Sequence, residues 1–232
     1  MAISGTPHQG QRFTGAELIV HLLERQGITT VAGIPGGAAL PLYDALSQST
    51  RIHHVLARHE QGAGFMAQGM ARANGKAAVC IASSGPGATN LVTAIADAKL
   101  DSIPLVCITG QVPSSMIGTD AFQEVDTYGI SIPITKHNHL VRDIRELPQV
   151  ICDAFRIAES GRPGPVWIDV PKDVQTAVIT LDELPPVAVP DAAPAFEAAA
   201  VAQAAAMINQ AKRPVLYLGW RHYLRQRLPT SD

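Results

Sequence analysis

The sequence predicts an α/β fold in which a parallel sheet carries helices on both faces. Short apolar runs alternate along the chain with longer segments of helical periodicity, the order typical of consecutive βαβ units. The apolar runs alternate little with polar residues, as expected for parallel strands that are buried on both faces. Hydrophobic residues make up 47% and charged residues 16% of the 232 residues, so the chain can bury a large core and general disorder is excluded.

Local signals in the first part of the chain define its elements in order. Thr14 and Glu17 have the spacing of a capping box, and the helix that they begin keeps its apolar residues on one face until Gly27. The strands that follow are apolar runs, and glycine-containing turns separate them from the helices. The expected elements are a strand over 28–32, a helix around 40–46, a strand over 52–56, a helix over 60–73 and a strand over 77–82.

The second part continues this alternation and then changes in composition. A glycine-rich turn over 83–90 leads into a helix that runs to about Leu100. Apolar patterns then predict strands over 104–109, 132–135 and 166–170, with a helix over 147–158 before the last of them. Residues 176–194 are rich in Pro, Ala and Val, which is typical of a linker, and an Ala-rich helix over 196–211 and a strand over 214–218 begin a second unit.

These elements divide the chain into a series of expected segments. They are a flexible N-terminus over 1–12, a domain over 13–175, a linker over 176–194, the start of a further domain over 195–219 and a tail over 220–232. The tail has three arginines in its first eight residues and lacks the apolar period of a helix. We expect the tail to be a frameshift product.

Charge, cysteine content and the N-terminal residues exclude several classes of protein. The 18 Lys and Arg against 20 Asp and Glu give a net charge of −2 without a basic block, so neither nucleic acid nor a membrane surface is an expected partner. Cys80, Cys107 and Cys152 lack metal-ligand spacing, which favours buried thiols in a reducing compartment. No apolar run has the length of a membrane span and no signal-peptide core is visible, so we expect a cytoplasmic protein.

Glycine-rich turns follow several of the expected strands. In an open parallel sheet, ligands bind beyond the carboxyl ends of the strands. The turns expected at that edge are Pro35-Gly36-Gly37, His59-Glu60, Gly85-Pro86-Gly87 with Asn90, and Gly110-Gln111. Each turn taken alone is more simply explained as a tight connection between a strand and a helix. Neither a Walker A loop nor a GxGxxG motif is present, so nucleotide binding lacks its usual motifs.

Glu60 leaves two interpretations open. It begins a helix whose next residues, over 62–64, are small, so its carboxylate faces the expected crevice with little cover. It can be a favourable charge at a helix N-terminus, or a desolvated acid suited to proton transfer. His137 and His139 lack a third ligand at metal-binding spacing, so we expect solvated or hydrogen-bonded histidines and no metal site.

Longer strings at the same edge resemble one enzyme family. The strings are Gly33-Ile-Pro-Gly-Gly-Ala38, Ala57-Arg-His-Glu-Gln-Gly-Ala-Gly64, Ser84-Gly-Pro-Gly-Ala-Thr-Asn90, Ile117-Gly-Thr-Asp-Ala-Phe-Gln-Glu124, and Gly161-Arg-Pro-Gly-Pro-Val166 through Pro171-Lys-Asp173. Together and in this order they resemble the pyrimidine-binding domain of acetohydroxyacid synthase (acetolactate synthase), a thiamine-diphosphate enzyme. The resemblance is strongest to the bacterial isozyme I branch of catalytic subunits and covers about Phe13 to Gly219. The family continues the turn at Gly219 as Gly-Gly-Val-Ile, and the codons that begin at Trp220 admit Gly-Val-Ile in a neighbouring reading frame, so the resemblance implies that the tail arose by a frameshift.

The resemblance implies a role for each matching residue. Glu60 would be the catalytic glutamate, whose carboxyl hydrogen-bonds N1′ of the aminopyrimidine so that the 4′-imine takes the C2 proton of the thiazolium ring. Gln123 would lie near the cofactor and the reacting carbons, with Phe122 beside it towards the substrate, and Arg162 would contact FAD. The thiamine pocket would be lined by Pro35, Gly36, Pro86 and Asn90. The substrate entrance would be formed by Gly37, Ala38, Pro113, Phe122 and Lys172.

The activity implied by the resemblance is carboligation in branched-chain amino-acid biosynthesis. Pyruvate is decarboxylated and joined to a second 2-keto acid, either pyruvate or 2-ketobutyrate. The implied cofactors are thiamine diphosphate, Mg²⁺ and FAD, and the implied partners are a second copy of the chain and a small regulatory subunit. The Gly-Asp-Gly…Asn-Asn motif that binds magnesium and the diphosphate in this family does not occur in the sequence, so we expect the isolated chain to be inactive and to bind thiamine diphosphate weakly. The alternative is a non-catalytic remnant that folds and at most pairs with an intact synthase subunit.

Overall fold

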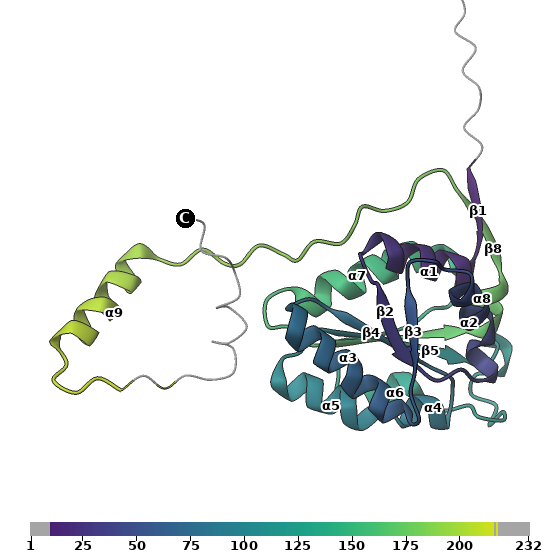
Figure 1. Cartoon of the computed structure of the whole chain (residues 1–232), viewed down its shortest axis with the longest axis horizontal. Helices are drawn as coiled ribbons and strands as arrows, with labels where there is room; N and C mark the ends of the chain where they lie inside the picture. Colours follow the sequence, from purple (N-terminus) through teal and green to yellow (C-terminus); the bar gives the residue numbers. More distant parts are fainter. Residues whose placement is uncertain (1–9, 216, 218–232) are drawn as a thin grey trace, which may run out of the picture.

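The computed structural model describes residues 10–215 and residue 217, and a six-stranded sheet lies at its centre (Figure 1). The strands are ordered β3-β2-β4-β5-β7-β6, and every neighbouring pair is parallel. Their bounds are β2 Thr30–Gly33, β3 His53–Leu56, β4 Ala78–Ala82, β5 Leu105–Gln111, β6 His137–Leu140 and β7 Pro165–Pro171. The predicted parallel sheet is confirmed.

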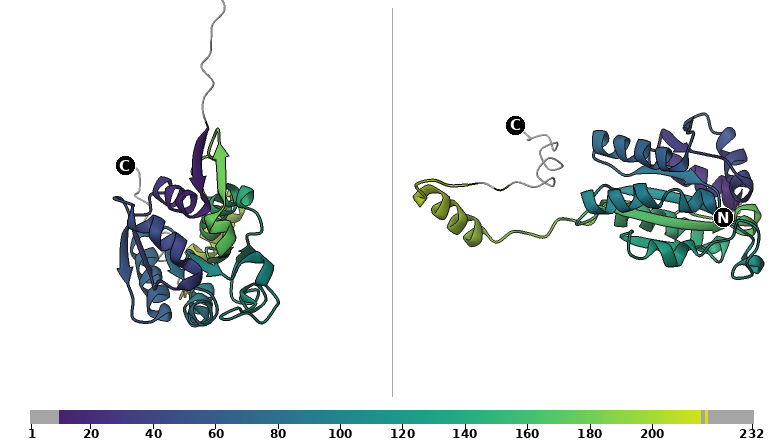
Figure 2. Two further views of the ribbon diagram at one scale, coloured as in Figure 1. Left: turned by 90° about the vertical axis from the view of Figure 1, so that its right-hand side faces the viewer. Right: turned by 90° about the horizontal axis from the view of Figure 1, so that it is seen from below.

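Helices cover both faces of this sheet, as predicted (Figures 1 and 2). One face packs against α1 (Gly15–Arg25), α2 (Leu40–Ser47) and α7 (Leu147–Glu159), and the other against α3 (Glu60–Asn74) and α5 (Val92–Asp101). The other helices of the described residues are α4 (Pro86–Thr89), α6 (Thr127–Ser131), α8 (Lys172–Thr176) and α9 (Ala198–Gln210). None of the helices among residues 10–215 is long and apolar enough to cross a membrane.

The core has two halves because successive side chains of a strand point to opposite faces. Val79 and Ile81 of β4 pack in the cluster of α1, α2 and α7, whereas Cys80 packs in the cluster of α3 and α5. Cys107 lies opposite Cys80 on β5, and their sulfur atoms are 3.3 Å apart. Both cysteines are buried and free, as expected, and Cys152 is half-buried.

The local signals of α1 and α3 are confirmed. The Thr14 hydroxyl accepts a hydrogen bond from the backbone N–H of Glu17 at 3.2 Å, and the Glu17 carboxylate accepts one from the backbone N–H of Thr14 at 2.7 Å. This reciprocal capping box satisfies two backbone donors that the helix itself leaves unpaired. Gly75 ends α3 in the left-handed conformation, with φ of 71°, as a glycine after the last turn of a helix commonly does.

The strand expected over 132–135 is wrong, because these residues form a turn after α6. The strand of this region is β6, which begins five residues further along and pairs with β7 from His137 to Leu140. β6 is an edge strand with exposed and half-buried residues, so it lacks the continuous apolar run by which the buried strands were recognised. The apolar run over 132–135 instead places Ile134 against the core.

Two further boundaries differ from the sequence prediction. The helix expected up to Leu100 is divided into α4 and α5 between Thr89 and Val92. β5 extends to Gln111, so Gly110 lies inside the strand and not in a turn beyond it. A Cβ on Gly110 would come within 2.3 Å of the Ala38 carbonyl oxygen, so a glycine is required where the neighbouring turn crosses the strand.

A small second sheet joins the two ends of the domain. β1 (Gln11–Thr14) pairs antiparallel with β8 (Val178–Leu181), which places Phe13 opposite Ile179. β8 thus lies in the stretch whose composition suggested a linker, and β1 begins within the expected flexible N-terminus. Phe13 is buried and Ile179 packs against the main core, so the pairing is held by apolar contacts that composition alone does not reveal.

The helix expected over 196–211 corresponds to α9, none of whose residues is buried. In Figure 1 it follows a long extended segment. Residues 216 and 218 of the expected last strand lie outside the described residues, as does the expected frameshifted tail over 220–232. The domain boundaries expected from composition stay a prediction.

Candidate functional site

The carboxyl edge of the sheet brings together the turns that the sequence singled out. Because β2, β3, β4, β5 and β7 are parallel, the segments that follow them lie at one edge. These segments carry every residue that the resemblance placed at the thiamine pocket or the substrate entrance, namely Pro35, Gly36, Gly37, Ala38, Glu60, Pro86, Asn90, Pro113, Phe122, Gln123 and Lys172.

Glu60 is the first residue of α3 and is half-buried. Its Oε2 accepts a hydrogen bond of 2.9 Å from the side-chain amide of Asn90, the residue that caps α4. Gly87 lies next to the other carboxylate oxygen, and a Cβ at Gly87 would be 3.6 Å from Glu60 Oε1. Asn90 therefore orients the carboxylate through one oxygen, and the small residue beside the other leaves room for a partner.

Tyr43 of α2 places its hydroxyl near the carboxyl end of β4, which the sequence analysis missed. Its hydroxyl donates to the Ile81 carbonyl at 3.1 Å, and it reaches that position because Gly33 has no side chain there. Burial raises the pKa of Tyr43 well above its usual range, and the nearby Cys80 and the charge of Glu60 raise it further. The sequence did contain a signal for this position. Tyr43 lies on the apolar face of a helix that follows a glycine-rich turn, so its hydroxyl could be expected to point towards the ends of the strands.

The turn over 34–39 is held from two sides. A Cβ on Gly36 would come within 2.5 Å of the Ser83 Cβ, and the Ser83 hydroxyl accepts a hydrogen bond from the Ala38 backbone N–H at 3.3 Å. The Ala38 carbonyl accepts a hydrogen bond of 2.8 Å from the buried side chain of Gln175. Pro35 and Gly37 are exposed, so this fixed turn presents its outer surface to solvent and to any ligand at the edge.

The loop over 112–126 carries Phe122 and Gln123. The Phe122 side chain is 87% exposed, which is unusual for a residue of its size. Gln123 has a positive φ of 59°, and its backbone lies against Gly85, where a Cβ would come within 2.5 Å of the Gln123 carbonyl oxygen. The backbone of Gln123 and the carboxylate of Glu60 thus lie against the same turn, at Gly85 and Gly87 respectively.

Pro113 and Lys172 are brought towards each other by their neighbours. Asp173 accepts hydrogen bonds from the backbone N–H of Ser114 at 2.9 Å and from its hydroxyl at 3.1 Å. These contacts tie the start of the loop to α8, which begins with Lys172. The two residues implied at the substrate entrance therefore lie on connected segments.

Arg162 does not join this group. It precedes β7 and therefore lies at the amino edge of the sheet, opposite the edge with Glu60. Its guanidinium donates to the Ser102 hydroxyl at 2.8 Å and to the Leu100 carbonyl at 3.1 Å, at the C-terminal end of α5. A contact of Arg162 with FAD stays a prediction, and any such contact would be made at that opposite edge.

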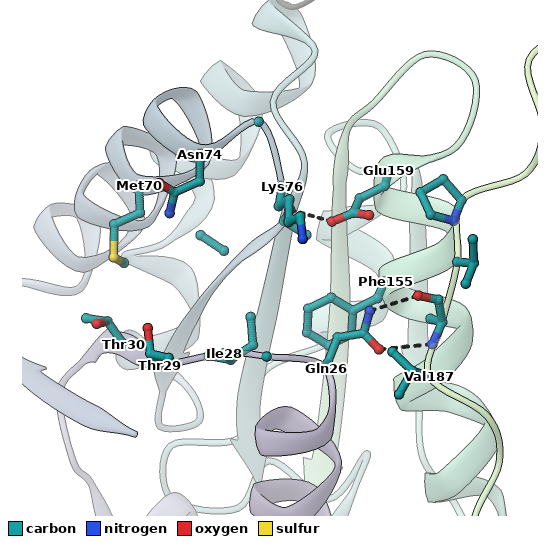
Figure 3. Close-up of a pocket in the computed structure, with 17 residues that line it drawn as sticks. Gln26, Ile28, Thr29, Thr30, Met70, Asn74, Lys76, Phe155, Glu159 and Val187 are labelled. Carbon is teal, nitrogen blue, oxygen red and sulfur yellow. Dashed lines mark hydrogen bonds between the residues drawn. The ribbon is translucent and has the colours of Figure 1, made fainter. Parts of the chain in front are cut away.

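A cavity of about 670 Å³ also lies at the amino edge (Figure 3). Gln26 closes one side by exchanging two hydrogen bonds of 3.0 Å with the backbone of Ala188, and Glu159 accepts a hydrogen bond of 2.7 Å from the Ala77 N–H. None of the residues predicted for the site lines this cavity. We therefore do not assign the candidate site to this cavity, despite its volume.

A second cavity, of about 300 Å³, is lined by His137, His139 and Glu146. His139 Nε2 lies 3.1 Å from a carboxylate oxygen of Glu146, so this histidine is hydrogen-bonded, as expected. Within the part of the chain that the structure describes, no three His, Cys, Asp or Glu residues are grouped so as to hold a metal ion.

Asp169 is a buried acid that the sequence analysis missed. It lies near the carboxyl end of β7 and is 3% exposed. Burial raises the pKa of Asp169 to about 6, although hydrogen bonds from Thr127, Thr109 and Gln111 act in the opposite direction. The run of apolar residues around it in the sequence indicated a strand but gave no sign that its one carboxylate is enclosed.

The raised pKa predicts how stability depends on pH. Between about pH 4 and pH 6 the folded chain keeps a proton on Asp169 that the unfolded chain releases, so the contribution of this group to stability falls as the pH rises. The free energy of unfolding of the wild type, relative to that of Asp169→Asn, should therefore decrease by about 2 kcal/mol from pH 4 to pH 7.

Urea unfolding at a series of pH values measures this difference. The same substitution at the exposed Asp182 controls for the loss of a surface charge. Parallel stability curves for the wild type and Asp169→Asn would contradict the burial of an acid with a raised pKa.

A large part of the chain matches a known protein family. Residues 13–130 match the sequence profile of the thiamine pyrophosphate enzyme, N-terminal TPP binding domain. The chain belongs to the thiamine pyrophosphate enzyme family. The matched part of this family member contains the turns that bear Pro35, Glu60, Pro86 and Gln123, and it ends before β7.

Curated relatives of this thiamine pyrophosphate family member include acetolactate synthases from bacteria and a plant. The chain is 76% identical to the acetolactate synthase isozyme 1 large subunit of Escherichia coli over 219 residues, which is 94% of this chain and 39% of the relative. It is 52% identical to the acetolactate synthase large subunit of Corynebacterium glutamicum, over 94% of this chain and 35% of the relative. It is 50% identical to the chloroplastic acetolactate synthase 3 of Brassica napus, over 88% of this chain and 32% of the relative. The chain thus spans about two fifths or less of the length of these proteins.

Proposed function

We propose that the chain is the N-terminal part of an acetolactate synthase large subunit and that it supplies the catalytic glutamate of carboligation. The observation that carries the proposal is the position of Glu60: half-buried, oriented by Asn90 and adjacent to Gly87 at the carboxyl edge of the sheet. The 76% identity to the large subunit of isozyme 1 supports the assignment to this enzyme rather than to another member of the family.

The residues at this edge fit the pyrimidine part of thiamine diphosphate. When bound, this cofactor supplies the carbon nucleophile needed to decarboxylate and join 2-keto acids. Asn90 holds Glu60 through Oε2, so Oε1, beside Gly87, is the oxygen that would meet a ring nitrogen and exchange a proton with it. Of the two interpretations of Glu60, the proposal adopts the acid suited to proton transfer. The exposed turns at Pro35 and Pro86 would line the ring.

The substrate side of the site would be formed by the 112–126 loop and α8. Phe122 and Gln123 would approach the reacting carbons of pyruvate and of a second pyruvate or 2-ketobutyrate. Pro113 and Lys172, tied together through Ser114 and Asp173, would lie at the entrance with Gly37 and Ala38. The Lys172 ammonium is suited to attract a 2-keto acid, because such substrates carry a carboxylate.

The other cofactors and partners implied for the synthase are part of the proposal. We assign the diphosphate and Mg²⁺ to protein groups outside residues 10–215, because those residues hold no cluster of ligands for a metal. FAD would reach Arg162 at the amino edge. The apolar side chains of Leu56, Phe65 and Met66, exposed on β3 and α3, support pairing with a second copy of the chain.

A small regulatory subunit is also proposed, since the relatives are named large subunits. The free, buried thiols of Cys80 and Cys107 support the cytoplasmic location, because reduced cysteines are the rule in that compartment.

A chimera tests the proposed function. The 219 residues that match isozyme 1 of Escherichia coli would replace the corresponding part of that enzyme, and acetolactate formation from pyruvate would be measured with thiamine diphosphate, Mg²⁺ and FAD. We expect the chimera to form acetolactate and the 232-residue chain alone to form none. An inactive chimera that folds and pairs with the intact enzyme would support the alternative of a non-catalytic remnant.

A further inference from the structure

A group of buried polar side chains lies at the carboxyl ends of β5 and β7, beneath the loop that carries Gln123. At its centre Asp169 Oδ1 accepts a hydrogen bond from the Thr109 hydroxyl at 2.8 Å. Asp169 Oδ2 accepts one from the side-chain amide of Gln111 at 2.9 Å and one from the hydroxyl of Thr127. The indole N–H of Trp167 donates to the Thr109 hydroxyl at 2.7 Å, so the group is continuous with the core.

These side chains come from different parts of the chain. Thr109 and Gln111 lie on β5 and Asp169 on β7, so three of them belong to adjacent, paired strands in the middle of the sheet. Thr127 is the first residue of α6 and directly follows the loop. Its bond to Asp169 therefore joins the end of the loop to the sheet.

Gln111 holds both ends of the same loop. Its side-chain oxygen accepts a hydrogen bond from the Val112 N–H at 2.8 Å, at the start of the loop, and its amide donates to the Val125 carbonyl at 3.1 Å, near the end. With Asp169 and Thr127, this side chain closes the loop into a ring whose base is buried. We call Asp169, Thr127 and Gln111 the clasp.

The loop above the clasp has little burial of its own. Met116 is 43% and Phe122 is 87% exposed. Gly118, Asp120 and Gln123 have positive φ, a conformation that costs free energy for the two non-glycine residues and persists where surrounding contacts impose it. The position of Gln123 therefore depends on contacts at the base of the loop as well as on its contact with Gly85.

We propose that Asp169 is a positioning residue whose bonds to Thr127 and Gln111 hold the 112–126 loop. The loop in turn keeps Gln123 over the turn that carries Gly85 and Gly87, and Glu60 lies beside that turn. The inference rests on the proposed function for the role of Gln123, but the attachment of the loop does not depend on it. An apolar residue at position 169 could fill the same space at no cost of burying a charge. A buried carboxylate that accepts hydrogen bonds from three donors fixes those donors in one arrangement, which apolar packing does not do.

Hydrogen exchange of the 232-residue chain, read residue by residue by NMR, tests the attachment. Thr127→Val keeps the shape of the side chain but removes the bond to Asp169, and we expect amides over 118–126 to exchange about tenfold faster. Thr127→Ser restores the hydroxyl and should return the exchange to the wild-type rate. Thr135→Val is the matched control, since this buried threonine donates only to the Ser131 carbonyl near the end of α6 and does not touch the clasp. Wild-type exchange of the loop in Thr127→Val would overturn the proposal.

A measurement on the unchanged chain covers the case in which Thr127→Val does not fold. The Thr127 N–H, which donates to the Val125 carbonyl at 2.8 Å, should become exchangeable only when β5 and β7 open. Its exchange should therefore accelerate with low concentrations of urea in parallel with amides of those strands. Exchange that is fast and insensitive to urea would show that the loop opens independently of the sheet, and the proposal would be wrong.

The chimera separates positioning from a general loss of structure. Thr127→Val should slow acetolactate formation while proton exchange at thiamine C2, which depends on Glu60, stays at the wild-type rate. Thr127→Ser should restore the wild-type rate of acetolactate formation. Equal losses in the two rates would contradict a role restricted to the loop. An inactive chimera would refute the proposed function and leave the hydrogen-exchange result to decide on the clasp.

Discussion

Glu60→Gln in the chimera is expected to lower the rate of acetolactate formation by about 100-fold or more. The glutamine has the same shape, and its side-chain oxygen can still accept the hydrogen bond that Asn90 donates to Glu60 Oε2 at 2.9 Å. The fold at the start of α3 should therefore be kept. What is lost is the ability of the group to give up and take back a proton at the oxygen beside Gly87, because an amide does not ionise near neutral pH.

Two measurements check this expectation. The rate of acetolactate formation should fall together with the rate of hydrogen–deuterium exchange at thiamine C2, since both depend on the same proton transfer. Glu146→Gln is the matched control, because this half-buried carboxylate pairs with His139 of β6 at the other end of the strand order. Unchanged exchange at C2 in Glu60→Gln would refute the role assigned to Glu60.

Gly85→Ala is expected to destabilise the chain by about 3 kcal/mol or more. Gly85 has φ of 53° and ψ of −120°, a conformation that a residue with a side chain rarely adopts. The added Cβ would also come within 2.5 Å of the Gln123 carbonyl oxygen and 2.8 Å of its Cα. Since the atoms that it meets belong to the backbone, the loop and the turn must move apart to accept it.

Urea unfolding followed by circular dichroism measures the loss of stability. Gly69→Ala is the control, because we expect this glycine substitution to increase stability. Gly69 lies inside α3, is exposed, and a Cβ there would meet nothing within 4 Å. An alanine at this position should stabilise the chain by about 0.5–1 kcal/mol. If the two substitutions change stability by the same amount, the close contact between Gly85 and Gln123 is not present in solution.

Features that depend on neighbours in the sequence were predictable. The capping box of Thr14 and Glu17, the start of α3 at Glu60 and its end at Gly75 follow from residues within a few positions of one another. The buried strands β4, β5 and β7 were found because both of their faces lie in the core, which requires a continuous apolar run. β6 escaped that criterion because part of its surface stays in water.

The candidate site was predictable in composition but not in arrangement. The motifs identified Glu60, Asn90 and Gln123, since each stands in a string that resembles the synthase family. The packing of separate elements decides which oxygen of Glu60 accepts the bond from Asn90. It also decides that the Tyr43 hydroxyl reaches the Ile81 carbonyl near the end of β4. Arg162 illustrates the same limit, because only the fold shows that it lies at the opposite edge of the sheet from Glu60.

The alternation of strands and helices along the chain, the parallel sheet and the family were evident from the sequence, because these depend on local patterns and on strings of adjacent residues. The tertiary structure decided which distant residues meet. Asp169, Thr127 and Gln111 are separated by as many as 58 positions, and they form a clasp only because β5 and β7 are neighbours in the sheet and the loop returns over them. Local periodicity carries no information about strand order, so contacts of this kind require the folded chain.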